Sequence, residues 1–149
     1  MTKRYEVDEV DKKLLEMLQE NARMQIKEMA AKVFLSSPAV SARIKNLEEQ
    51  GYICGYQAVV DPQALGYHIK ALIQLEVEPA DKKEFYPFIE SCGNVTECNC
   101  VTGDYSMIIE GMFHSTEELD QFINEIQHFG KTRTLIVFST PVKKRGIKI

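Results

Sequence analysis

The sequence lacks the long apolar runs that membrane proteins need. No stretch approaches the roughly 18 consecutive apolar residues of a membrane-spanning helix. The N-terminal residues MTKRYEVDEVDKK are charged and contain no apolar core of the kind found in signal peptides. Low-complexity segments are absent too. We therefore expect a cytoplasmic globular protein, and 149 residues suit one domain or two small ones.

Patterns typical of catalytic and metal sites are also missing. The four cysteines, Cys54, Cys92, Cys98 and Cys100, show no CxxC spacing, and the three histidines form no ligand pattern. Cys98 and Cys100 are two apart on an expected strand, so they share a face and bridge each other badly. No Ser/His/Asp set, phosphate-binding loop, HExxH motif or paired-carboxylate spacing is visible. The sequence therefore predicts reduced thiols, no metal, no cofactor and no enzymatic activity.

The net charge of −4 argues at first against a nucleic-acid partner. The charges are unevenly distributed, however. Residues 1–60 hold nine Lys or Arg and nine Asp or Glu, whereas residues 61–149 hold nine and thirteen. Between Arg23 and Gln50, five basic and three acidic side chains leave +2. Because DNA binding depends on a local patch, the first part of the chain remains a candidate, with dimerisation supplying further affinity.

Two short helices are predicted between residues 26 and 51. Apolar residues recur at helical spacing in two runs, Ile26, Met29, Ala30, Val33 and then Val40, Ile44, Leu47. Ser36 or Ser37 can cap the second helix, because a serine oxygen accepts hydrogen bonds from the free amides of a first turn. Pro38 suits that turn, where amides lack intrahelical partners. Two short helices joined by a tight turn are typical of a helix-turn-helix.

The outward face of the second helix carries small and polar side chains. Small residues let a helix enter a major groove, and Ser, Asn, Lys and Arg donate hydrogen bonds to phosphates or bases. The solvated face of an ordinary helical pair shows the same pattern, so the residues alone leave both interpretations open. Arg43 has a further alternative, a salt bridge to Glu48 or another acid. The candidate DNA-binding residues are Ser36, Ser37, Pro38, Ala39, Ser41, Ala42, Arg43, Lys45 and Asn46.

The remaining elements of the first 60 residues complete a small domain. A helix capped by Asp8 is predicted over 9–21 and should pack across the helix-turn-helix. Residues 52–60 alternate in polarity, which predicts a short wing or linking strand. The turn at 61–66 marks the boundary, so we expect domains at 1–60 and 61–149.

Short motifs in this part of the chain occur in one order: Asp8-x-x-Asp11-x-Lys13-Leu14-Leu15, Asn21-x-Arg23, Ala30-x-x-Val33-x-Leu35-Ser36, Val40-x-x-Arg43-Ile44-x-x-Leu47-Glu48, Gly51-Tyr52-Ile53-x-Gly55-Tyr56 and Asp61-Pro62-x-x-Leu65-Gly66. Through them the segment from Val7 to Gly66 resembles the N-terminal part of the Lrp/AsnC (feast/famine) transcription regulators. The remainder resembles the ligand-binding domain of the same family. The resemblance implies transcription regulation through double-stranded DNA, an amino-acid effector, and a homodimer that assembles into an octamer. Gln25 and Phe34 depart from the Ser or Thr cap and the small turn residue that are common in the family.

After the boundary the hydrophobic period changes. Strands are predicted over 69–77, 95–101, 105–113 and 132–142, with helices over 80–92 and from Ser115 to Gly130. The order βαββαβ predicts a ferredoxin-like domain with four antiparallel strands and two helices on one face. The fold class is therefore α+β, an N-terminal winged helix-turn-helix followed by a C-terminal ferredoxin-like domain.

Several strands are apolar on both sides, which one layer of helices cannot cover. Met107 to Ile109 and Leu135 to Phe138 are continuous apolar runs. Ile108, Ile136 and Phe138 are the residues expected on the uncovered sheet face. A doubly apolar strand needs cover on both faces, so we expect two sheets to pair across a twofold axis.

A candidate effector site lies at Gly103, Asp104, Tyr105 and Ser106. Gly103 permits a positive φ, successive amides can hold a carboxylate, and Asp104 can pair with an ammonium group. A plain hairpin turn explains the same residues. In the Lrp/AsnC family a similar Gly-Asp-Tyr-Asp element lies at the effector site between dimers. Ser106 replaces the last Asp and removes one negative charge, which should lower affinity for ordinary amino acids.

Two other functional classes remain as alternatives. Siroheme decarboxylases resemble this family in fold, but such an enzyme needs His or Arg side chains around a tetrapyrrole. The three histidines, His68, His114 and His128, make no convincing set for that role. The second alternative is a ligand sensor that does not bind DNA.

Overall fold

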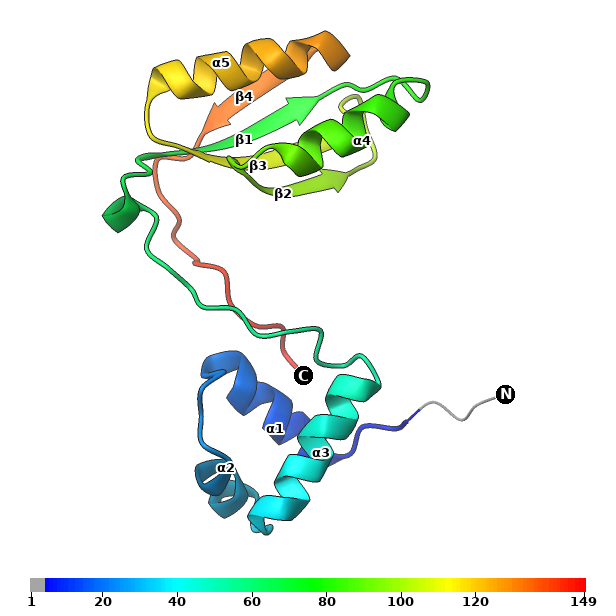
Figure 1. The fold of residues 1–149 in the computed structure, drawn as a ribbon, viewed down its shortest axis with the longest axis vertical. Helices are drawn as coiled ribbons and strands as arrows, with labels where there is room; N and C mark the ends of the chain where they lie inside the picture. Colours follow the sequence, from blue (N-terminus) through cyan, green and yellow to red (C-terminus); the bar gives the residue numbers. More distant parts are fainter. Residues whose placement is uncertain (1–4) are drawn as a thin grey trace. The chain divides into compact units, whose positions relative to one another are not determined.

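The computed structural model describes residues 5–149, and these form two compact units (Figure 1). The first unit contains the chain up to Val59 together with Val142–Ile149, and the second contains Val60–Pro141. The C-terminal segment therefore belongs to the first unit, whereas the sequence had placed it with the second domain. Its contacts explain the difference, because the backbone of Ile147 is hydrogen-bonded to the side chain of Gln19.

The first unit is built from three helices, α1 (Glu9–Glu20), α2 (Ile26–Val33) and α3 (Ser37–Glu49). Asp8 caps α1 in a capping box with Asp11, in which each carboxylate accepts the other residue's amide. The apolar faces of the three helices form one core, Leu14, Met29, Ala30, Val33, Val40 and Ile44. The predicted helix-turn-helix and the helix that packs on it are confirmed.

The wing or linking strand predicted over 52–60 is not formed in the part of the chain that the structure describes. A strand needs a neighbouring strand to receive its hydrogen bonds, and the first unit offers only helices. Side chains hold this extended segment instead. The Tyr52 hydroxyl donates to the Tyr5 carbonyl at 2.7 Å, and the Tyr56 hydroxyl donates to Glu48 at 2.7 Å.

The second unit has the predicted βαββαβ order. A short 3-10 turn, η1 (Gln63–Leu65), precedes the sheet, and a second one, η2 (Gln127–Phe129), follows the last helix. The four strands are ordered β2-β3-β1-β4, and every neighbouring pair is antiparallel. The elements are β1 (Ile69–Leu75), α4 (Lys82–Ser91), β2 (Val95–Cys100), β3 (Met107–Phe113), α5 (Thr116–Ile126) and β4 (Thr132–Ile136).

One sheet face packs against both helices. In β1 and β3 the buried residues of this face alternate with half-buried ones, as a two-sided pleat requires. They join side chains of α4 and α5 in a single core: Ala71, Ile73, Leu75, Met107, Ile109 and Phe113 from the strands, and Phe85, Ile89, Leu119, Phe122 and Ile126 from the helices.

No helix among the described residues of the second unit covers the other sheet face, and the strand register decides which residues lie on it. Leu72 is paired with Leu135 and Gln74 with Ile108, so these four residues share the uncovered face. Ile108 lies on the uncovered face as predicted, but the prediction for Ile136 is wrong, because Ile136 pairs with buried Ala71 and so lies toward the helix side. A one-residue change of register exchanges the two faces of a strand. β4 also ends at Ile136, so Phe138 lies beyond it and is 98% exposed.

Candidate DNA-binding surface and effector loop

The start of α3 is fixed by its cap. Ser36 has extended backbone angles, and its hydroxyl accepts a hydrogen bond from the Ala39 amide at 3.3 Å. Of the two serines considered, Ser36 is therefore the cap and Ser37 is the first helical residue. Pro38 follows in the first turn, where it removes no intrahelical hydrogen bond.

The structure separates the candidate DNA-binding residues of α3 into two groups. The exposed members are Ser36, Pro38, Ser41, Ala42 and Lys45, and the half-buried members are Ser37, Ala39, Arg43 and Asn46. The exposed group is mostly small, with a single long cation in Lys45. The Lys45 side chain is 75% exposed and lies 3.7 Å from Glu49, so its ion pair is weak and open to exchange.

Arg43 does not share that exposed face, because its guanidinium points to the start of α1. Its Nη1 donates to Asp8 at 2.8 Å and to Asp11 at 2.9 Å. These hydrogen bonds raise the pKa of Arg43, with the bond to Asp11 contributing most. The alternative of a salt bridge to an acid is therefore the one observed, although the acids are on α1 and not at Glu48.

Asp11 is the centre of this contact. It is fully buried, and its carboxylate also accepts the Tyr5 hydroxyl at 2.6 Å and the Asp8 amide at 3.3 Å. The hydrogen bond to Asp11 raises the pKa of Tyr5. A hydrogen bond from the Asp11 amide and then the one from Arg43 lower the pKa of Asp8. A buried carboxylate needs such partners, since an uncompensated buried charge is strongly destabilising.

Both departures from the family pattern are visible at the two ends of α2. Gln25 precedes α2 without any side-chain cap. Phe34 ends α2 in the left-handed conformation at φ 57°, and it is 93% exposed. That conformation costs a non-glycine residue roughly 1–2 kcal/mol. Phe34 therefore keeps the backbone geometry that a small residue would adopt more easily, at a cost in stability.

The candidate effector residues occupy the loop between β2 and β3. Gly103 has φ +113°, Asp104 is exposed, and no hydrogen bond within residues 5–149 uses the amides from Gly103 to Tyr105. Ser106 was also a candidate effector residue, but its hydroxyl is hydrogen-bonded within the chain. That hydroxyl donates to the Val77 carbonyl at 3.2 Å and accepts the Val77 amide at 2.9 Å. Ser106 thus attaches the loop to the chain just after β1, while Asp104 and the free amides remain accessible.

The cysteines and histidines bring no second site. All four cysteines are free thiols, and burial raises the pKa of Cys92 and Cys98. Across residues 5–149 no three His, Cys, Asp or Glu side chains gather as a metal ion would require. His114 stacks on Tyr67 with 3.9 Å between ring centres.

None of the helices in the described part of the chain is long and apolar enough to cross a membrane.

Each of the two units matches a known protein family, and a single relative covers both. Residues 7–53 match a family model described as winged helix-turn-helix DNA-binding, and residues 70–147 match the Lrp/AsnC ligand binding domain. The HTH-type transcriptional regulator LrpA of Bacillus subtilis is 34% identical, covering 88% of this chain and 97% of the relative.

Two solved structures extend the comparison to the fold. B. subtilis LrpC superimposes with a TM-score of 0.89 at 28% identity, covering 94% of this chain and 100% of that one. The feast or famine regulatory protein Rv3291c from M. tuberculosis, complexed with L-methionine, gives a TM-score of 0.85 at 26% identity, covering 95% and 99%. The similarity therefore spans both units.

Arg43→Gln should lower the free energy of unfolding by about 3 kcal/mol, because it leaves buried Asp11 without its cation. Lys45→Gln, the matched change on the exposed face of α3, should stay within about 0.5 kcal/mol of the wild type. Urea unfolding measures both.

The stability difference should also depend on pH. Because the pKa of Asp8 is lowered in the folded state, the carboxylate's contribution to the free energy of unfolding is present above its ordinary pKa and disappears as the pH falls through the folded pKa. The gap between wild type and Arg43→Gln should therefore narrow below about pH 4.

If Arg43→Gln is as stable as the wild type at neutral pH but loses DNA binding, Arg43 is a DNA contact and not a positioning residue.

Proposed function

This chain belongs to the Lrp/AsnC family of transcriptional regulators, and we propose that it binds double-stranded DNA through the exposed face of α3 and responds to an amino acid or a related metabolite. The observation that carries the DNA contact is the exposed first half of α3. Ser36, Pro38, Ser41 and Ala42 present little bulk there, so the backbone of the helix can approach the floor of a major groove.

The same face supports a loose sequence preference. With Arg43 held by Asp8 and Asp11, Lys45 is the long cation of this surface, and bidentate base contacts are few. Phosphate contacts position a protein without reading sequence. DNA bending and A/T-rich shape should therefore provide much of the specificity.

The effector proposal rests on the loop between β2 and β3. A solved relative is complexed with L-methionine. A site for an α-amino acid needs an anionic group for the ammonium and hydrogen-bond donors for the carboxylate. Asp104 can receive the ammonium group, and the amides from Gly103 to Tyr105 can receive the carboxylate. Ser106 takes no part, because its hydroxyl is bonded to Val77.

Assembly into dimers, and of four dimers into an octamer by family likeness, is proposed from the uncovered sheet face. Leu72, Ile108, Met112 and Leu135 lie there without helices above them. Pairing of two such faces across a twofold axis would remove this apolar surface from water. Dimerisation would also double the number of α3 helices on one duplex.

The enzymatic alternative has less support. The relatives named above are transcriptional regulators. His114 is hydrogen-bonded to the Gly66 carbonyl at 2.8 Å in addition to its stack on Tyr67, so a tetrapyrrole would have to displace both contacts. A tetrapyrrole absorbance band in the purified protein would support the enzyme.

With DNA as the partner, we keep a cytoplasmic location as part of the proposal.

The DNA proposal is tested by binding to the region upstream of the protein's own gene. Lys45→Ala should weaken binding to specific and unrelated DNA alike, and the slope of log K against log[salt] should fall by about one per subunit. Lys83→Ala, an exposed change on α4, is the control and should bind as the wild type. Equal behaviour of the two variants would remove α3 as the contact, and no binding by the wild type would leave the sensor alternative.

The effector proposal is tested by a thermal-shift screen of the protein amino acids. A ligand that binds only the folded state raises Tm, and at about 100 Kd it adds roughly 2.7 kcal/mol. Asp104→Ala should abolish the response, whereas Asp81→Ala, a change at another exposed aspartate, should keep it. If no amino acid stabilises the wild type, or if Asp104→Ala responds equally, the loop is only a turn.

The assembly proposal is tested by light scattering at micromolar concentration. Leu135→Asp should raise the dimer dissociation constant about a hundredfold or more, because it buries an unpaired charge. Leu65→Asp places the same charge on η1 and should leave the dimer intact. A stable wild-type monomer would contradict the proposal.

A further inference from the structure

The charge of the first unit depends on its C-terminal segment. Without that segment the unit holds nine basic and nine acidic side chains and is neutral. Residues 142–149, VKKRGIKI, add four cations and no acid, so the complete unit carries +4. The second unit holds five basic and thirteen acidic side chains, or −8, which restores the total of −4. The positive charge of the DNA-binding unit therefore comes from eight residues at the C-terminus.

The other cations of the first unit are partly engaged already. Lys12, Lys32, Arg43 and Lys45 form ion pairs with acids of the same unit. Affinity for DNA depends largely on the number of phosphates that a protein neutralises. Among the described cations of the helices and their connections, Lys13, Arg23 and Lys27 lie outside these ion pairs, so the helices alone offer few further cations for a polyanion.

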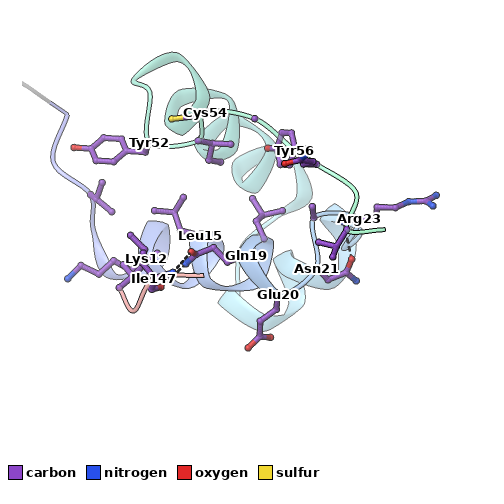
Figure 2. A pocket seen from close by; sticks show the side chains of 18 residues that line it. Lys12, Leu15, Gln19, Glu20, Asn21, Arg23, Tyr52, Cys54, Tyr56 and Ile147 are labelled. Carbon is purple, nitrogen blue, oxygen red and sulfur yellow. Dashed lines mark hydrogen bonds between the residues drawn. The ribbon is translucent and has the colours of Figure 1, made fainter. Parts of the chain in front are cut away.

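The C-terminal segment is held against α1 by defined contacts. The Gln19 side chain accepts the Ile147 amide at 2.8 Å and donates to the Ile147 carbonyl at 3.0 Å, the two bonds marked in Figure 2. Gly146 permits this approach, because a Cβ there would lie 2.4 Å from the Gln19 Oε1. Ile147 and Ile149 line an apolar groove of about 700 Å³ together with Leu15 and other residues of α1 and the 52–59 segment.

While the isoleucines lie along the groove, the cations of the segment are exposed. Every residue of the segment is exposed, and these include Lys143, Arg145 and Lys148, while Ile147 beside the groove is 78% exposed. A unit of this size has a radius of gyration of only about 11 Å. Cations on its surface are therefore within reach of a duplex that bends around the unit from α3.

We propose that the C-terminal segment is a second DNA contact, in which Lys143, Arg145 and Lys148 bind phosphates that flank the site read by α3. The proposal rests on the proposed DNA-binding function. DNA is favoured over an acidic protein as the partner because the segment is docked on the unit that carries α3, and because its cations give that otherwise neutral unit its net positive charge.

The test compares two double variants of the full chain by fluorescence anisotropy with a duplex that extends beyond the site on both sides. Lys143→Gln with Lys148→Gln should lower the slope of log K against log[salt] by about two per bound subunit. Over a fourfold rise in salt, the wild type should then lose about tenfold more affinity than this variant. Lys83→Gln with Lys131→Gln removes the same charge from exposed positions of the second unit and should keep the wild-type slope.

A third variant separates docking from charge. Gln19→Ala keeps every cation but removes both hydrogen bonds to Ile147, so Kd at low salt should rise severalfold because the segment must be ordered on binding. An unchanged Kd overturns the docked arrangement. A wild-type slope for the Lys143 and Lys148 variant overturns the second contact, provided that the wild type binds and Lys45→Ala weakens it. If the wild type binds no DNA, the proposed function fails instead.

Discussion

One buried carboxylate sets the geometry of the DNA-binding unit. Asp11 is fully excluded from solvent on α1, and its charge is compensated by Arg43 of α3 at 2.9 Å and by the Tyr5 hydroxyl at 2.6 Å. Because a buried charge without its partner is strongly destabilising, α3 cannot rotate or slide far on α1. The side of α3 opposite Arg43 is thereby kept exposed, and that is the side with Pro38, Ala42 and Lys45.

Much of this architecture follows from local sequence patterns. The 3.6-residue period identifies α2 and α3 within residues 26–51, and the serines at 36 and 37 with Pro38 mark the start of α3, although only the structure selects Ser36 as the cap. The βαββαβ order follows in the same way, because each element is a short run with its own period. The partners of Arg43 could not be predicted. They lie 32 and 35 residues away in sequence, so only the packing of α1 against α3 brings them together.

Long-range contacts also explain the other differences. The face of Ile136 depends on register with β1, which the apolar run in β4 leaves undefined. Ser106 is bonded to Val77, 29 residues earlier, so its role in the loop is structural despite its position beside Asp104. The docking of residues 142–149 on α1 depends on Gln19, a residue that no local pattern distinguishes. The helices that carry the candidate DNA face were thus more predictable than the contacts of Ser106 or of the C-terminal segment.

We propose that α3, held by Asp11 and Arg43, is the surface that meets DNA. Hydrogen exchange measured by mass spectrometry, with and without a bound duplex, tests it most directly. DNA should slow exchange in peptides covering Ser36–Asn46, while peptides of α4 and α5 in the second unit should exchange as they do without DNA. Protection confined to the second unit, or none in α3 when the duplex is saturating, would contradict it.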